Sequence, residues 1–220
     1  MIVESPEMTK LEQLLERSAA WHSHLCPRQV LGVRMGLLAG RVLDLDVPNP
    51  DKRLLTVAET DGCAADGLSA ATGCSVGNRM LRVLDFGKVA ATFVDLMCDK
   101  AYRIAPQSGI RTAAQRMVPD AKSRWQAQLI GYQVIPDLEL FTVQEVQLSI
   151  SLEKLLSKPG YRVNCETCGE EIINEREVAH GATVLCRACA GQSYYRAAGQ
   201  GMPQLFRYEQ SEECLLGRGR

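Results

Sequence analysis

The sequence has little of what marks a membrane protein or a nucleic-acid-binding protein. No apolar run reaches the roughly 18 residues that a helix needs to cross a bilayer. Charge of neither sign is in excess, because 25 lysines and arginines stand against 26 aspartates and glutamates. Since nucleic-acid binders usually carry a basic excess, this balance disfavours that class. The first residues lack a basic segment followed by an apolar one, so we expect no secretory signal and a cytoplasmic location.

Histidine is scarce and cysteine is abundant, with three histidines and nine cysteines in 220 residues. In a reducing compartment, cysteines more often bind metals, react or fill the core than form disulfides. Four of the nine form two close pairs and the rest are scattered. We expect Cys74 and Cys98 to be small buried residues, and Cys214 to be a thiol of the tail without an assigned role.

The two close pairs predict a structural zinc site. They read Cys165-x2-Cys168 and Cys186-x2-Cys189, with 17 residues between them. Four thiolates satisfy a tetrahedral zinc ion completely, and each CxxC turn directs two sulfurs at the same ion. A module of about 35 residues buries too little apolar surface to fold alone, so the metal must stabilise it. We expect a small treble-clef or zinc-ribbon-like finger with a short hairpin between the pairs and a helix over 186–195.

The finger does not resemble a nucleic-acid-binding surface. Its arginines are offset by nearby glutamates, which favours a structural or dimer-forming module. The segment Lys158-Pro159-Gly160 marks the expected boundary. We therefore divide the chain into a core over 1–157, a finger over 158–196, and a tail over 197–220 that becomes ordered only against a partner.

Helices and strands mix without a regular βαβ rhythm in the core, which favours an α+β fold with a mostly antiparallel sheet. A capping box of Thr9 and Glu12 and a start at Ser5-Pro6 predict the first helix, and Pro27 opens the second. The expected helices cover 6–21, 27–44, a short stretch after Gly62, and 107–133 with a break near Pro119; the expected strands cover 53–60, two segments of 80–96, and 138–150.

Gly32, Gly36 and Gly40 recur every four residues and line one face of the second helix. Each glycine costs about 1 kcal/mol of helix stability relative to alanine. Three on one stripe indicate that something approaches the helix closely there. Packing against another helix or strand is the simpler interpretation, and a bound ligand is the alternative.

The chemistry of the core lies in three segments, which read HSHLCPRQVLGVR over 22–34, CAADGLSAATGCSVG over 63–77 and DFGKVAATF over 85–93. Cys26 and Cys63 each stand at an expected helix start, where the helix dipole stabilises a thiolate. With His22 or His24 they would form a second metal site with an open position, suited to zinc, nickel, copper or iron rather than magnesium.

Two further residues belong to this candidate site. Asp66 follows Cys63 by one helical turn and would orient a metal ligand or a histidine. Lys88 would bind an anionic cofactor, or else be an ordinary surface lysine at a strand start. The alternative for each histidine is a hydrogen-bonded cap of the turn.

In order and spacing, these three segments resemble the FmdE family, named for the FmdE component of formylmethanofuran dehydrogenase. The family motifs read HxHxCPxxxxGxR, CxxDxxxxxTGCTxG and D[YF]GKxAxTF, and some members add a C-terminal treble-clef zinc finger. The chain departs from the pattern at Asn78-Arg79, where the family often has lysine. The resemblance covers about residues 10–195. It implies an α+β core, a homodimer, and association with molybdenum- or tungsten-dependent formylmethanofuran metabolism, without implying catalysis by this chain.

The first functional hypothesis is a metal-binding accessory protein of one-carbon metabolism. It would hold a metal or a metal-bound cofactor at the Cys/His site in the core, with structural zinc in the finger. One alternative is a group-transfer enzyme with Cys63 or Cys26 as nucleophile. A second is a haem or tetrapyrrole-binding protein, because Cys-Pro beside histidine can ligate iron. The third, a zinc-finger regulator that binds nucleic acid, is disfavoured by the charge balance.

Overall fold

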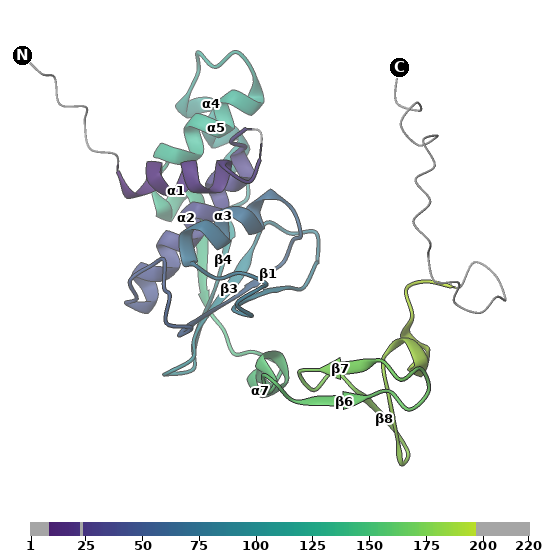
Figure 1. Cartoon of the computed structure of the whole chain (residues 1–220). Helices are drawn as coiled ribbons and strands as arrows, with labels where there is room; N and C mark the ends of the chain where they lie inside the picture. The colour runs from purple at the N-terminus through teal and green to yellow at the C-terminus, as the bar shows by residue number, and fades with distance from the viewer. Residues whose placement is uncertain (1–8, 23, 197–220) are drawn as a thin grey trace, which may run out of the picture. The chain divides into compact units, whose positions relative to one another are not determined.

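The computed structural model describes residues 9–22 and 24–196. The expected start of the first helix at Ser5-Pro6, Cys214, and the tail over 197–220 lie outside the described residues. The chain divides into two compact units, one up to Leu152 and the other from Glu153 onward (Figure 1). None of the described helices is both long enough and apolar enough to cross a membrane.

The first unit is built on a five-stranded sheet in the order β2-β1-β3-β4-β5. Its strands are β1 (Leu54–Ala58), β2 (Leu81–Val83), β3 (Ala91–Asp95), β4 (Lys100–Pro106) and β5 (Phe141–Glu145). Strands β1 and β2 are parallel, and the other neighbours are antiparallel. Every residue of β1 and β3 is buried, which explains their continuous apolar sequences. The predicted α+β class with a mostly antiparallel sheet is confirmed.

Helices α2 and α3 pack against the sheet, and α1 lies over both (Figure 1). The helices of this unit are α1 (Lys10–Ala19), α2 (Pro27–Leu43), α3 (Cys63–Thr72), α4 (Ile110–Met117), α5 (Arg124–Val134) and the single turn α6 (Asp137–Leu140). The capping box of α1 is confirmed: the Thr9 N–H donates to Glu12 Oε2 at 2.7 Å, and the Glu12 N–H donates to Thr9 Oγ1 at 3.3 Å. The predicted break near Pro119 separates α4 from α5.

Three predictions about this unit were wrong or incomplete. The strand expected over 138–150 begins only at Phe141, because the Pro136 carbonyl accepts hydrogen bonds from the Glu139 and Leu140 N–H groups and forms the helical turn α6. Strand β4 was missed. Cys98 is exposed rather than buried; it lies in the turn after β3, where its thiol donates to Asp95 at 3.1 Å. Cys74 is buried, as expected.

The glycine stripe of α2 lets the backbones of α2 and α3 touch. A Cβ added at Gly32 would lie 2.2 Å from the Ala64 carbonyl oxygen and 3.0 Å from Gly67 Cα, and one added at Gly36 would lie 2.6 Å from Ala71 Cβ. The offset between contacting residues is the same at both points, so the two helices run parallel and their first turns are neighbours. The expectation of close helix packing is confirmed.

The second unit holds two small hairpins. Strands β6 (Arg162–Asn164) and β7 (Glu171–Ile173) form one, and β8 (Val178–His180) and β9 (Thr183–Leu185) form the other. The helix α7 (Leu152–Leu156) stands at the junction of the two units. The helix expected over 186–195 is a shorter π-helical turn, Ala188–Gln192, which stops where Gly191 has a φ of 84°.

We predict that Gly32→Ala destabilises the first unit by about 1–3 kcal/mol, because the new methyl group overlaps the α3 backbone. This loss outweighs the gain of about 1 kcal/mol in helix propensity. Trp21 and Trp125, the two tryptophans of the chain, both lie in the first unit, so urea unfolding followed by tryptophan fluorescence reports on that unit. Gly77→Ala is the matched control, since an added Cβ there meets nothing within 4 Å. Equal midpoints for the two variants would contradict the role of the contact.

Candidate functional site

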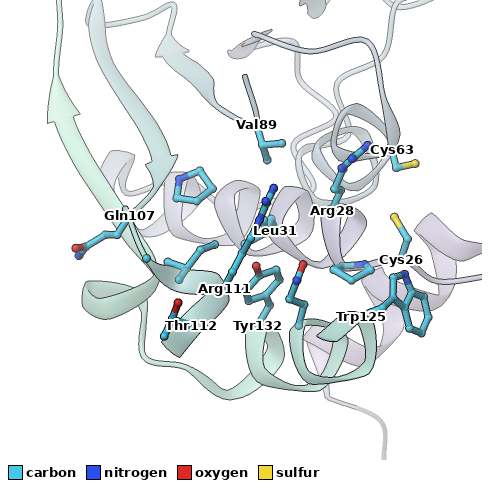
Figure 2. A pocket seen from close by; sticks show the side chains of 15 residues that line it. Cys26, Arg28, Leu31, Cys63, Val89, Gln107, Arg111, Thr112, Trp125 and Tyr132 are labelled. Carbon is cyan, nitrogen blue, oxygen red and sulfur yellow. The ribbon is translucent and has the colours of Figure 1, made fainter. Parts of the chain in front are cut away.

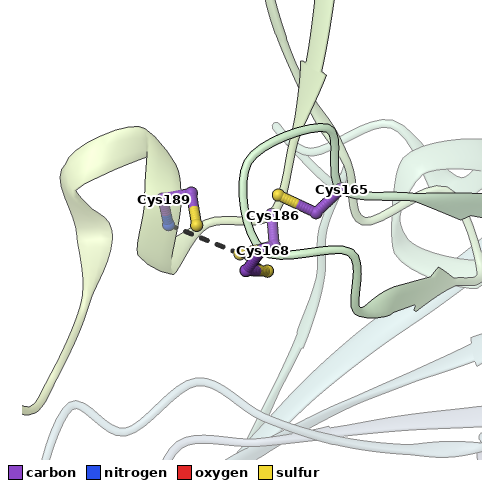
Figure 3. A group of neighbouring side chains, drawn as sticks. All are labelled: Cys165, Cys168, Cys186 and Cys189. Atoms are coloured by element: carbon purple, nitrogen blue, oxygen red, sulfur yellow. Dashed lines mark hydrogen bonds between the residues drawn. The ribbon is translucent and has the colours of Figure 1, made fainter. Parts of the chain in front are cut away.

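The four cysteines of the two CxxC pairs converge in the second unit (Figure 3). Their sulfurs all lie within 4.8 Å of one another, and Cys168 Sγ and Cys186 Sγ are 3.9 Å apart. Four sulfurs about 2.3 Å from one tetrahedral zinc ion would stand about 3.8 Å from each other, so the arrangement fits that metal. Gly169, with a φ of 78°, closes the first turn by donating its N–H to the Cys165 carbonyl at 2.8 Å.

The electrostatics of this cluster also suit a bound cation. Backbone N–H groups of Cys168 and Cys186 lower the pKa of Cys165 to about 6. The neighbouring thiols, Cys186 first, raise the pKa of Cys189 to about 12. The site therefore stabilises a first thiolate and resists further negative charge, which a divalent cation would offset.

The first turns of α2 and α3 bring Cys26 and Cys63 together in the first unit. Cys26 is the N-cap of α2 and Cys63 is the first residue of α3, as expected. Figure 2 shows the Cys26 thiol directed toward Cys63. Burial, followed by the interaction with the Cys26 thiol, raises the pKa of Cys63. The expectation that the helix dipole favours a Cys63 thiolate is therefore wrong, because burial and the second thiol outweigh it.

The histidines lie apart from each other. His22 Nε2 and Asp66 Oδ2 are 2.6 Å apart, with each side chain about one-third exposed, so Asp66 does pair with a histidine. His24 is exposed, and its ring centroid is 6.5 Å from that of Trp125. Among residues 9–22 and 24–196, the four-cysteine cluster is the only group in which three or more His, Cys, Asp or Glu ligand atoms lie within 4.8 Å of one another. The structure thus forms a thiol pair and a His–Asp pair, and a joint ligand set stays a prediction.

Lys88 lies at the exposed start of the DFGK segment. Its backbone N–H donates to the Glu59 carbonyl at 3.1 Å, and its side chain does not line the pocket beside the thiols. A role for Lys88 in binding an anion stays a prediction.

Gln29 positions the Cys26 turn, a role that was not predicted from the sequence. Its side chain is fully buried; Oε1 accepts from the Cys26 N–H at 2.8 Å, and Nε2 donates to the Ser18 carbonyl at 2.9 Å. The end of α1 and the start of α2 are thereby held together. The signal was present, because glutamine three residues after an N-cap is the second half of a capping box.

A pocket of about 680 Å³ opens beside the two thiols (Figure 2). Residues of α2, α4 and α5 form most of its wall, together with Cys63 of α3 and the segment that follows β4. Besides Cys26 and Cys63, its lining includes Arg28, Leu31, Arg111, Trp125 and Tyr132. The last three were not predicted, since α4 and α5 are remote in sequence from the cysteines. Burial raises the pKa of Tyr132, which keeps its phenol protonated.

Two comparisons with individual proteins show what the chain is similar to. The chain is 31% identical over 225 aligned positions to a probable S-adenosyl-L-methionine-binding protein of Archaeoglobus fulgidus, an alignment that covers 90% of this chain and 58% of that protein. The chain thus spans less than two-thirds of that relative. The crystal structure of an FmdE-like protein of tungsten formylmethanofuran dehydrogenase type from Syntrophus aciditrophicus superposes with a TM-score of 0.52 at 23% identity, over 84% of this chain and 95% of that chain. That likeness shows the fold.

Family models match both units. Residues 159–195 match the prokaryotic dksA/traR C4-type zinc finger, in the segment where the four sulfurs meet. Residues 21–142 match the family described as FmdE, molybdenum formylmethanofuran dehydrogenase operon, and this match includes both pocket cysteines. The chain therefore belongs to the FmdE family and carries a C-terminal C4-type zinc finger.

Proposed function

We propose that the chain is a metal-binding accessory protein of formylmethanofuran or related one-carbon metabolism. Residues 1–157 would hold a transition metal or a metal-bound cofactor where Cys26 and Cys63 meet, and residues 158–196 would be stabilised by zinc. The convergence of two thiols from two helix starts on one pocket wall is the observation that carries this proposal. The homodimer and the cytoplasmic location that the family resemblance implies belong to the same proposal.

The surroundings of the thiol pair support a metal site. Asp66 follows Cys63 by three positions on α3, so both side chains lie on one face of the helix. Its contact with His22 holds the imidazole on that face, and a histidine paired with a carboxylate is the usual arrangement for a metal ligand. Two thiols with an adjoining pocket leave coordination positions open, as a cofactor-binding or catalytic metal requires. The raised pKa of Cys63 counts against the alternative of an unassisted thiolate nucleophile.

We expect about two metal ions per chain after reconstitution with zinc, and about one in the double variant Cys26→Ser, Cys63→Ser, measured by mass spectrometry of bound metal. The finger serves as the internal reference, because its cysteines are unchanged. Cys98→Ser is the matched control for loss of an exposed thiol. One ion per chain in both the wild type and the double variant would exclude the core site.

The finger should lose its fold without metal. Structural zinc contributes about 10–16 kcal/mol in isolated finger peptides, so Cys168→Ser with Cys186→Ser should leave residues 158–196 open to proteolysis. The tryptophan-monitored unfolding of the first unit should not change, since both tryptophans lie there. Protection of 158–196 equal to that of the wild type would argue against a structural zinc.

S-adenosylmethionine binding is a second candidate, suggested by the relative from Archaeoglobus fulgidus. A pocket of about 680 Å³ falls within the usual range for small-molecule sites, and half-exposed Trp125 offers a surface for a purine ring. The charges oppose it, because S-adenosylmethionine is a net cation and the lining holds two arginines and no acidic residue. We therefore expect no saturation by S-adenosylmethionine up to about 1 mM in calorimetry. Micromolar binding that Trp125→Ala abolishes would establish this second function instead.

A further inference from the structure

The pocket beside Cys26 and Cys63 carries an unbalanced positive charge. Its lining includes Arg28 from the first turn of α2 and Arg111 from the first turn of α4, with no aspartate or glutamate among the lining residues. The chain as a whole has a formal net charge of −1. Two positive charges are therefore gathered in one pocket of a chain that is otherwise close to neutral.

These two arginines differ from the arginines that have structural roles. Five other arginines form ion pairs with a carboxylate, namely Arg34, Arg41, Arg53, Arg103 and Arg162. Neither Arg28 nor Arg111 forms an ion pair with any carboxylate of the described part of the chain. Arg111 contacts the hydroxyl of Tyr132 instead, and Arg28 lies near Cys63 (Figure 2).

The rest of the lining strengthens an attraction for anions. Leu31, Ile110, Tyr132 and Trp125 supply apolar and aromatic surface around the two guanidinium groups. In a pocket with such walls, charges interact more strongly than at an open surface, because less water screens them. A guanidinium group offers a planar fork of N–H donors that matches a carboxylate or a phosphate.

We propose that this pocket binds a small molecule with a carboxylate or phosphate group and a planar apolar part. Arg28 and Arg111 hold the anionic group, and Trp125 and Leu31 contact the planar part. Because Arg28 lies near Cys63, the ligand is held beside the thiol pair. This inference deepens the proposed function, since it names the class of ligand for the same pocket, and it rests on that function only for the purpose that the metal would serve.

Two fluorescent probes that differ in one charged group test the proposal. The first, 8-anilinonaphthalene-1-sulfonate, is a planar anion, and the second, N-phenyl-1-naphthylamine, is its neutral counterpart without the sulfonate. We expect the intact chain to bind the anion on the order of tenfold more tightly than the neutral probe. Replacing both arginines, Arg28→Gln with Arg111→Gln, should remove this preference and leave the affinity for the neutral probe within about twofold.

Arg116→Gln is the matched control, an exposed position on α4 whose side chain does not line the pocket. Displacement of the anionic probe by benzoate or by phenyl phosphate tells which anionic group the arginines prefer, and benzamide should displace it poorly. Equal affinity for the two probes in the wild type, or an unchanged preference in the double arginine variant, overturns the proposal.

The metal and the anion fail separately in these measurements. The double arginine variant should keep the core metal ion, and the Cys26→Ser, Cys63→Ser variant should keep the preference for the anionic probe. Loss of the preference in the cysteine variant would mean that the metal ion, rather than the arginines, holds the anion, and it would overturn the assignment to Arg28 and Arg111.

Discussion

The backbone contact between α2 and α3 is the constraint on which the rest of the first unit depends. Gly32 and Gly67 face each other, and a Cβ on either would lie within 2.3 Å of a carbonyl oxygen of the other helix. Since the helices run parallel, this contact places their first turns side by side. Cys26 and Cys63 meet for this reason, although 36 residues lie between them in the sequence. The glycines thus act on the site without belonging to it.

The two units use cysteine in different ways. In the finger, four thiols surround one point and leave no position for another ligand, which is the arrangement of a structural metal. In the first unit only two thiols meet, and they adjoin a pocket with two arginines that form no ion pair with described carboxylates. The proposed functions follow this difference: a closed zinc site stabilises one unit, and an open site in the other receives an anionic ligand.

Local chemistry in the sequence predicted much of this structure. The capping box of Thr9 and Glu12, the helix start at Pro27 and the four-cysteine spacing each depend on residues close together in the chain. Strand β4 was missed because Arg103 interrupts its apolar residues, and the two hydrogen bonds that offset its burial come from Glu59, 44 positions away. The thiolate predicted at Cys63 failed for a related reason, since burial is a property of the folded chain. The pocket wall of Arg111 and Trp125 has no signal in the sequence near the cysteines.

The central claim is that Cys26 and Cys63 form one side of a metal site. A crystal structure of the zinc-reconstituted chain, with anomalous scattering measured on both sides of the zinc absorption edge, tests it most directly. We predict two anomalous peaks, one among Cys165, Cys168, Cys186 and Cys189 and one about 2.3 Å from the sulfurs of Cys26 and Cys63. A single peak in the finger, or a second peak that touches neither core cysteine, would contradict the claim.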